Sequence, residues 1–347
     1  MRESLLKSLR CPGCGNNSLS LHRGAVNQIE IRSGRIACGH CSAEYKIEDG
    51  IIDFLNNANE NVIRERIAMD EDEYITDESG NKYRITVETI NKFKDKFLSL
   101  PEGDGSYFFK SGGSFQSTAE ASGRFYSALS DLHLTGKERI LEIGACFSYA
   151  SFKFAKKGCS VVALDISNYL KVSDFFIKEA YFDRMFSDMH YMPFVDNTFD
   201  IVFGSAVLHH SKNLKNAFSE ILRVLKPGGR LVLINEAARG VLEKVHTVYK
   251  KMEEKGFSDT AYTLPEWKKG AQEAGFRRIK TIFLSIADDY ITKYKNRNSK
   301  HTFKVELAYF FRKHRRIESF LLFFLILPRL LFRPRSWRII AYKNAEN

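Results

Sequence analysis

The stretch between Ile140 and Asp165 constrains the fold of this chain more than any other. The apolar residues 140–143 read as a strand that runs into Gly144, and a second apolar run, Val161–Leu164, ends at Asp165. A strand, a tight turn, a helix and a second strand that ends in a carboxylate make up the front half of a nucleotide-binding βαβ unit. Asp165 follows Gly144 by 21 residues, about the separation at which an acidic side chain reaches the hydroxyl groups of a ribose bound over the first turn.

The residues after Gly144 bear on the kind of nucleotide that this unit would bind. A dinucleotide site needs G-x-G-x-x-G, because glycines let the backbone approach a pyrophosphate closely. Here Cys146 and Ser148 stand at the next positions of the turn. The pattern therefore disfavours a pyrophosphate.

Three further groups of residues follow the first turn in a fixed order. They are the segment Ser187–Phe194, the run Asn197–Val202 with Leu208-His209-His210 after it, and the helix, K-P-G-G turn and strand of Leu222–Leu233. Together with the first turn, they resemble the class I S-adenosylmethionine-dependent methyltransferases over roughly residues 120–286 and again at 336–343. Several motifs in the family's order are far more specific than one glycine loop.

This resemblance implies a doubly wound α/β fold with a Rossmann-like, seven-stranded sheet, and S-adenosylmethionine as the cofactor. It assigns the cofactor contacts to Glu142, Gly144, Ala145, Cys146, Asp165, Ile166, Asp188, Met189 and Ser205. The family's second and third glycines are Cys146 and Ser148 here, and both are small enough to keep the backbone close to the methionine part of the cofactor. His209 and His210 resemble positions close to the methyl group, where a histidine either accepts a proton from the acceptor or only shapes the pocket.

Four of the six cysteines form two C-x-x-C pairs separated by 23 residues: Cys11 and Cys14, then Cys38 and Cys41. Four thiolates in this layout close a tetrahedral zinc site, as in a zinc ribbon. Disulfides or redox thiols are the alternatives, but disulfides need an oxidising compartment, and residues 1–10 lack the apolar run of a signal peptide. We therefore expect structural zinc and a cytoplasmic protein.

The first 55 residues carry a second resemblance. Leu5–Cys14, Cys38–Cys41 and Glu44–Leu55 look like the small zinc-ribbon activator subunit of tRNA and release-factor methyltransferases, although Lys46 and Ile52 replace that family's two prolines. Such ribbons also occur fused to methyltransferase domains. A four-cysteine site has no open coordination position, so its expected role is to fold the module and dock it.

We expect three regions along the chain: a zinc ribbon at 1–56, a linker and lid at 57–117, and a methyltransferase domain at 118–347. The acidic run 70–73 is typical of a solvated face, and the aromatic residues 107–109 are candidates for the lid. The periodicity predicts an amphipathic helix over Thr118–Leu132 and a helix over Leu264–Ala274, and strands at 278–284 and 336–342.

An insertion of about fifty residues, 287–335, separates the last two predicted strands, where the resembling family has a short hairpin. Residues 293–347 contain 14 basic and 3 acidic residues, so they carry the whole net charge of +11. The apolar run Phe320–Leu327 is far shorter than the roughly 20 residues that a spanning helix needs. Aromatic and leucine side chains beside Arg312–Arg316 are instead typical of an element that lies on an anionic membrane surface, at the inner face of the membrane.

Two other interpretations of residues 303–332 stay open: a helical subdomain that packs on the core or a second subunit, and a nucleic-acid-binding element. Ligands of a doubly wound sheet lie at the carboxyl ends of its strands, where the insertion also begins. An O-methyltransferase for a small-molecule, glycan or lipid-linked acceptor fits this placement. RNA base methylation is the enzyme alternative, disfavoured by the even charge of residues 1–292, and a cofactor-binding scaffold without turnover is the non-enzyme alternative.

Overall fold

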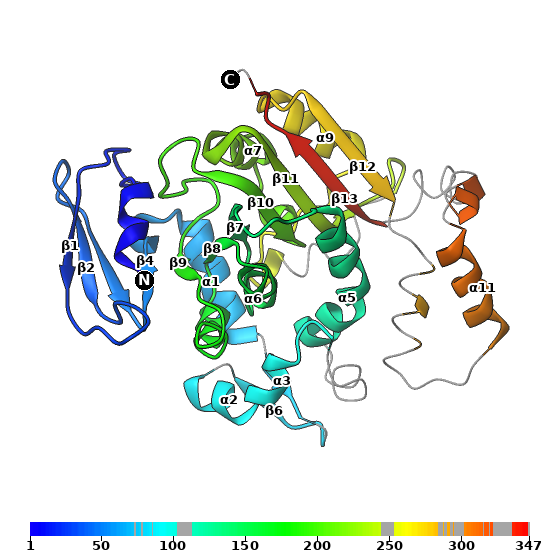
Figure 1. Cartoon of the computed structure of the whole chain (residues 1–347), viewed down its shortest axis with the longest axis horizontal. Helices are drawn as coiled ribbons and strands as arrows, with labels where there is room; N and C mark the ends of the chain where they lie inside the picture. The colour runs from blue at the N-terminus through cyan, green and yellow to red at the C-terminus, as the bar shows by residue number, and fades with distance from the viewer. Residues whose placement is uncertain are drawn as a thin grey trace.

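The computed structural model describes residues 1–345 except 73, 78, 85, 103–112, 244–252, 284–286, 288–289, 292–293, 295–301, 315, 319 and 322–334. One eleven-stranded sheet runs through the described part of the chain, with helices on both of its faces (Figure 1). The strands are ordered β1-β2-β3-β4-β9-β8-β7-β10-β11-β13-β12.

Seven of these strands form the doubly wound sheet that the sequence predicts. They are β7 (Arg139–Ile143), β8 (Ser160–Asp165), β9 (Asp183–Phe186), β10 (Phe199–Ser205), β11 (Leu225–Ala238), β12 (Arg278–Phe283) and β13 (Arg335–Tyr342). The central strands are parallel, and β13 is antiparallel to both of its neighbours. Helices cover both faces, which explains why the central strands read as continuous apolar runs.

The other four strands extend the same sheet from the N-terminal side. They are β1 (Leu19–Arg23), β2 (Gly34–Cys38), β3 (Glu44–Glu48) and β4 (Ile51–Asp53), which pair in an antiparallel meander. β4 then pairs in parallel with β9, with Ile51 opposite Arg184 and Asp53 opposite Phe186. Residues 1–56, which we call the four-cysteine module, are therefore continuous with the main sheet through its backbone.

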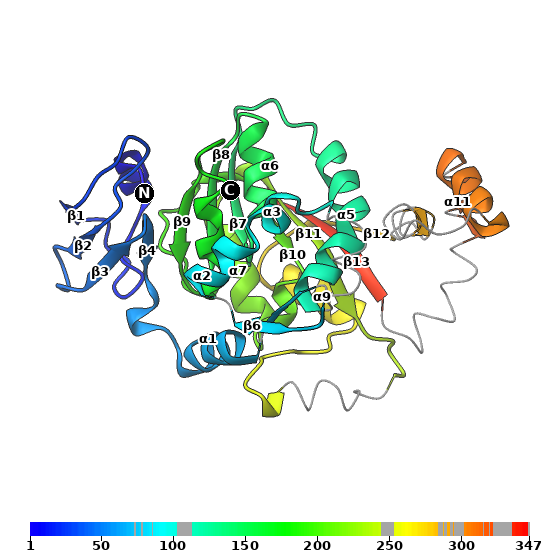
Figure 2. The ribbon, with the colours of Figure 1, turned by 90° about the horizontal axis from the view of Figure 1, so that it is seen from below.

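The side chains of the central strands alternate between two apolar clusters, one on each face of the sheet. Ile140, Val161 and Ile201 pack with helices α5 (Gly113–Asp131) and α6 (Tyr149–Lys156), whereas their neighbours along the strands pack with α7 (Leu214–Val224) and α9 (Leu264–Glu273). Figure 2 shows these two pairs of helices on opposite sides of the strands. Helices α5 and α9 confirm the two helices predicted from periodicity.

Residues 57–117, expected to be a linker and lid, contain regular structure. The elements are η2 (Leu55–Asn57), α1 (Glu60–Asp72), the hairpin of β5 (Tyr74–Thr76) and β6 (Lys82–Arg84), α2 (Val87–Lys92) and α3 (Lys94–Leu98). Phe93 and Phe97 are buried in the apolar cluster that contains α5 and α6, so α2 and α3 pack on the domain. The lid candidates Tyr107, Phe108 and Phe109, and Glu73 of the acidic run, lie outside the described residues.

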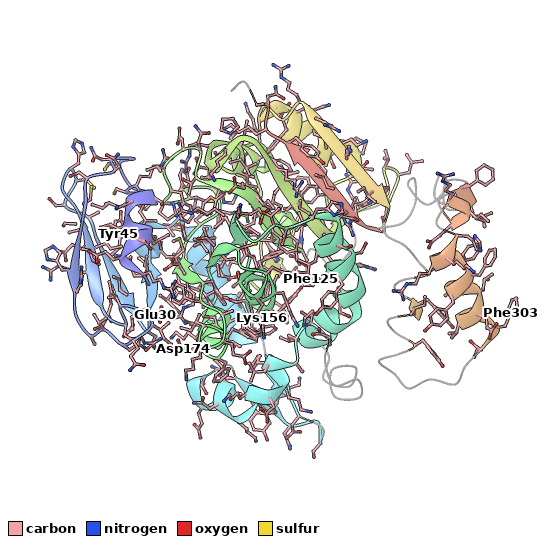
Figure 3. All side chains as sticks on the ribbon, viewed as in Figure 1. Glu30, Tyr45, Phe125, Lys156, Asp174 and Phe303 are labelled. Carbon is pink, nitrogen blue, oxygen red and sulfur yellow. The ribbon has the colours of Figure 1, made fainter. Side chains whose placement is uncertain are left out.

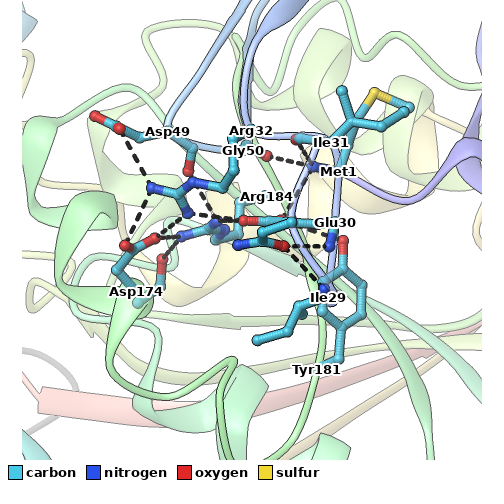
Figure 4. A network of polar contacts seen from close by, with 12 residues as sticks. Met1, Ile29, Glu30, Ile31, Arg32, Asp49, Gly50, Asp174, Tyr181 and Arg184 are labelled. Atoms are coloured by element: carbon cyan, nitrogen blue, oxygen red, sulfur yellow. Dashed lines mark hydrogen bonds and ion pairs between the residues drawn. The ribbon is translucent and has the colours of Figure 1, made fainter. Parts of the chain in front are cut away.

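A buried ionic network joins the four-cysteine module to the main sheet (Figure 4). Arg184 of β9 has no exposed side-chain surface and binds Glu30 and Asp174, and Asp174 ends the 3-10 helix η3 (Asn168–Asp174). Arg32 contacts the same two carboxylates at 2.9 and 2.7 Å. The guanidinium of Arg184 also donates to the Asp49 carbonyl at 2.9 Å.

The module and the domain also share an apolar core. Leu5 of η1 (Glu3–Ser8), Ile36 and Ile52 belong to one buried cluster with Leu164 of β8 and Met185 of β9. The four-cysteine module and the domain therefore do not have separate cores. The physical reason is that β4 supplies a free strand edge beside β9, so the apolar faces of both parts become one continuous surface.

The C-terminal insertion is attached differently. Helix α11 (Phe303–Lys313) lies beyond β12 and β13, at the opposite end of the sheet from the four-cysteine module (Figures 1 and 2). Val305 and Ala308 are buried, whereas Phe303 is 80% exposed and points away from the protein (Figure 3). None of the helices in the described part of the chain is both long and apolar enough to cross a bilayer. Most of the run Phe320–Leu327 lies outside the described residues.

Candidate active site

A cavity of about 910 Å³ opens at the carboxyl ends of the parallel strands. It is lined by all nine residues assigned to the cofactor from sequence: Glu142, Gly144, Ala145, Cys146, Asp165, Ile166, Asp188, Met189 and Ser205. His209 and His210 line it as well. These residues come from the ends of β7, β8, β9 and β10, because parallel strands bring their carboxyl ends to one edge of the sheet. Their individual roles remain predictions.

The first turn leaves no room for a side chain at Gly144. Gly144 has a φ of 63°, and a Cβ atom there would lie 2.3 Å from Cγ2 of Val207 in the loop after β10. Cys146 and Ser148, which replace two glycines of the resembling family, keep positive φ values of 46° and 59°. The turn therefore retains the backbone course of a glycine-rich loop with small side chains in place of two glycines.

Asp165 closes the first turn from the end of β8. One carboxylate oxygen accepts from the Cys146 backbone N–H at 2.6 Å and the other from the Ser167 N–H at 2.7 Å. The side chain is buried, and this burial raises its pKa. Asp165 thus holds the two loops that flank the cavity at a fixed separation.

Glu142 lies one strand away, on β7, and is also fully buried. Its carboxylate accepts from the backbone N–H of Ser151 at 2.7 Å and from the Ser151 hydroxyl at 2.5 Å. Burial raises the pKa of Glu142 to about 8. Ser151 lies in the first turn of α6, so this contact also fixes the start of that helix.

Asp188 is oriented by a histidine that sequence reasoning missed. His190 Nδ1 lies 2.6 Å from the Asp188 carboxylate, and His190 Nε2 lies 2.7 Å from the Ser211 hydroxyl. The His190 backbone N–H also donates to Asp188 at 2.9 Å. Asp188 keeps an orientation on the cavity wall through these contacts.

His209 and His210 belong to the 3-10 helix η4 (Leu208–His210), which a buried carboxylate holds in place. Glu236 accepts from the backbone N–H groups of Val207 and Leu208, both at 2.9 Å, and lies 3.0 Å from Nδ1 of His209. Burial opposes the ionisation of Glu236, but its hydrogen bonds from His209 and from these amides lower its pKa. The other ring nitrogen of His209, Nε2, is therefore the one that can contact a ligand in the cavity.

His210 lies between two carboxylates. Its Nδ1 atom is 2.7 Å from Glu65 of α1 and 3.2 Å from Asp259. Burial disfavours the charged imidazolium, yet the nearby Glu65 and Asp259 raise the pKa of His210. Asp259 also lies 3.8 Å from Nε2 of His209.

Sequence reasoning missed Glu65, His190, Glu236 and Asp259. Glu236 had a usable signal, since it is a carboxylate within the apolar strand β11. Glu65 and Asp259 had no signal in the sequence, because they belong to segments far apart in the chain that only folding brings to the cavity.

The four N-terminal cysteines come together as the spacing predicts. Their sulfur atoms lie within 4.8 Å of one another, and the pairs Cys11–Cys41 and Cys14–Cys38 are 3.6 Å apart. Four sulfurs around one zinc ion are about 3.8 Å apart, whereas a disulfide bond is about 2.05 Å long. The Tyr45 hydroxyl lies 3.0 Å from the Cys11 sulfur. The arrangement fits a tetrahedral ion and contains no disulfide.

Comparisons with known proteins point to the same part of the chain. A family model described as a methyltransferase domain matches residues 141–233. The chain is 36% identical over 115 residues to a demethylmenaquinone methyltransferase of Renibacterium salmoninarum, a match that covers 32% of this chain and 48% of that protein. It is 31% identical over 97 residues to a sterol 24-C-methyltransferase of Schizosaccharomyces pombe, covering 26% of each. The chain thus spans about half the length, or less, of these curated relatives.

Among solved structures, the chain is similar to phosphoethanolamine N-methyltransferase 2 of Haemonchus contortus in complex with S-adenosyl-L-methionine. The TM-score is 0.49 at 20% identity, over 76% of this chain and 62% of that one. The family match itself extends from Leu141 of β7 to Leu233 of β11, the segment that builds most of the cavity. Residues 141–233 are thus the part of the chain that matches a methyltransferase domain.

Proposed function

We propose that this protein transfers the methyl group of S-adenosylmethionine to a hydroxyl group of an acceptor at a membrane surface, such as a lipid-linked glycan. The observation that carries the proposal is the single cavity lined by all nine assigned residues, with two histidines on its wall. The sulfonium methyl group is already activated, so the protein has to align the acceptor with the carbon–sulfur bond and assist the loss of the hydroxyl proton. An oxygen–carbon bond forms as the sulfur–carbon bond breaks.

The cofactor would lie over the first turn, with its ribose on Asp165 and its adenine beside Ile166, Asp188 and Met189. Gly144 supports this placement, since any side chain there would collide with Val207 and move the turn. Cys146 presents its small side chain to the cavity at the position of the family's second glycine. His209 and His210 would then face the acceptor rather than the nucleoside.

The choice of a membrane-associated acceptor is supported by α11. Its exposed apolar residues include Phe303, Leu307 and Phe310, and Lys304, Arg312 and Lys313 are exposed beside them. Such a combination binds anionic lipid surfaces by inserting rings and pairing cations with headgroups. Two relatives are named for a demethylmenaquinone and a sterol, which are apolar acceptors.

Cofactor binding is tested by calorimetric titration of S-adenosylmethionine into wild-type protein and Asp165→Ala. We expect the variant to lose about 1.5–3 kcal/mol of binding free energy, because a charge-assisted hydrogen bond to the ribose is removed. Glu179→Ala is a matched control, since Glu179 is an exposed carboxylate outside the cavity. Equal affinity of wild type and Asp165→Ala would exclude the ribose assignment.

Turnover is tested with a labelled methyl donor on lipid-linked glycans, free sugars and RNA. Labelling of the lipid-linked glycan supports the proposal. Labelling of RNA alone would favour an RNA base methyltransferase, and cofactor binding without labelling of any acceptor class would favour a scaffold.

The four-cysteine cluster supports a second proposal, a structural zinc ion in the module at residues 1–56. The sulfur separations fit the ion, and the backbone N–H of His40 points to the Cys38 sulfur at 3.4 Å, as donors around zinc thiolates do. We expect one zinc per chain in reduced protein and none at this site in Cys38→Ser. Because the module shares its core with the domain, this variant should also lower the melting temperature of the domain, whereas Cys159→Ser should keep the zinc.

A further inference from the structure

The side chains on the acceptor side of the cavity carry an imbalance of charge. Glu65, Glu236 and Asp259 are all at least 84% shielded from solvent, with side-chain exposures of 8%, 1% and 16%. Within the described part of the chain, these three carboxylates form ion pairs only with His209 and His210, and no lysine or arginine contacts them. Buried carboxylates need cations, and three carboxylates outnumber the two imidazoles even when both imidazoles are protonated.

The geometry of the contacts differs from that of ordinary hydrogen bonds. His210 Nδ1 and the Oδ1 atom of Asp259 are both inaccessible to solvent and lie 3.2 Å apart. Neither atom makes a well-aligned hydrogen bond among the described residues, although Nδ1 is also 2.7 Å from Glu65. Nε2 of His209 is 3.8 Å from that Asp259 oxygen, too far for a hydrogen bond. Ligand atoms around a first-row metal ion with bonds near 2.0–2.1 Å are about 3.3 Å apart, close to the 3.2 Å between His210 and Asp259. The ligand atoms of His209, His210 and Asp259 all lie within 4.8 Å of one another.

The surroundings of His209 match those of a metal-binding histidine. A ligating imidazole usually donates its second ring N–H to a carboxylate, which fixes the ring and the tautomer. Glu236 has this relation to His209 Nδ1, and it is itself held by the amides of Val207 and Leu208. The Thr260 N–H donates to the His209 carbonyl at 2.8 Å and so fixes Asp259 beside η4.

We propose that His209, His210 and Asp259 bind a divalent first-row metal ion at the wall of the cavity, with Glu65 beside it and Glu236 as a positioning residue. This inference rests on the proposed function for its role, since three protein ligands leave an open position for an oxygen atom of the acceptor. An ion there lowers the pKa of a bound hydroxyl, and the released proton passes to water at the cavity mouth. Two imidazoles suit such a site, because they bind the ion as neutral ligands while the ion itself balances the carboxylates.

Zinc is a suitable probe for this site, because imidazole and carboxylate ligands both accept it. Full-length wild type, His210→Ala, Asp259→Asn and the control His22→Ala are dialysed to equilibrium against a series of zinc concentrations, and bound zinc is counted by elemental analysis. His22 is an exposed histidine on β1, outside the cavity. We expect wild type and His22→Ala to bind one more ion than either site variant, and Glu236→Gln to bind that ion roughly 10–100-fold more weakly.

The same dialysed samples are titrated with S-adenosylmethionine, so that the two proposals fail separately. Cofactor binding with equal zinc counts in wild type, His210→Ala and Asp259→Asn would overturn the metal site and leave the proposed function standing. An extra zinc ion in wild type without binding of S-adenosylmethionine would overturn the proposed function and leave the metal site standing. If a site variant fails to fold, as judged by circular dichroism, His209→Gln gives the same comparison without adding charge.

Discussion

The main sheet carries an addition at each end, and the two are attached in opposite ways. The four-cysteine module joins through the β4–β9 ladder, a buried ionic network and a common apolar cluster. At the other end, among the described residues, Ala308 of α11 packs with Ala287 and Ile291 in a small cluster that is separate from the two apolar clusters of the main sheet. The module therefore belongs to the cooperative unit that folds, whereas the exposed face of α11 remains available for a partner.

The largest effect is expected from the centre of the module's attachment. Arg184→Leu should lower the free energy of unfolding by about 3 kcal/mol, because the fully buried Glu30 and the partly buried Asp174 lose one cation. The value lies at the low end of the range for a broken buried pair, since Arg32 still contacts both carboxylates. Urea denaturation measures it.

Phe303→Ser on α11 is the matched control for Arg184→Leu. Phe303 is 80% exposed, so its loss should change the free energy of unfolding by less than about 0.5 kcal/mol. If the free energies of unfolding of both variants lie within about 1 kcal/mol of that of wild type, the module is attached no more firmly than α11.

The second effect concerns lipid binding by α11. Replacing Lys304, Arg312, Lys313 and Arg316 with glutamine should weaken binding to anionic vesicles by about 1 kcal/mol per residue at low salt, with little change in stability. Sedimentation with vesicles measures it. The control replaces four exposed lysines elsewhere, Lys157, Lys178, Lys215 and Lys268.

If wild type and the variant with the four glutamines both sediment with the vesicles, or if neither does, then α11 is not the element that binds the membrane. In the second case, the basic insertion would be a packing or oligomerisation element. Activity on a water-soluble acceptor fragment should survive the four substitutions in and just after α11, whereas activity on a membrane-embedded acceptor should fall.

The smallest effect is a pH dependence at the module's attachment. Burial opposes the ionisation of Asp174, but Arg32 and Arg184 lower its pKa below the ordinary value. A carboxylate of this kind contributes stability above its ordinary pKa of about 3.9, and that contribution is lost as the pH falls further. Between about pH 5 and pH 3, wild type should therefore lose more unfolding free energy than Asp174→Asn. If the unfolding free energies of the two proteins fall in parallel as the pH is lowered, the contact of Asp174 with Arg32 and Arg184 is not ionic.

The sequence allowed the seven-stranded sheet to be predicted because its signals are local. Apolar runs such as Val161–Leu164 and the helix over Leu264–Ala274 are fixed by periodicity and by capping residues; Thr263 and Glu266 form a capping box at the start of α9. The nine residues assigned to the cofactor lie at strand ends, whose meeting point follows from the parallel topology.

The pairing of β4 with β9 could not be predicted in the same way. β4 has only three residues, and nothing in Ile51–Asp53 specifies a partner 133 residues away. The same holds for Asp259 and Glu65, which meet His210 only after α1 and the segment before α9 have packed over η4. Long-range contacts between single side chains leave no periodic signal.

The pairing of β4 with β9 also has a consequence for solubility. Without the module, β9 would end the sheet with unpaired backbone N–H and C=O groups, which are a template for the addition of another chain. With it, the outer strands are β1, which carries His22 and Arg23, and β12, which carries Arg278 and Lys280. Cations on an outer strand discourage such addition. A chain truncated before β7 would therefore be prone to aggregate through β9, even where the remaining domain could fold.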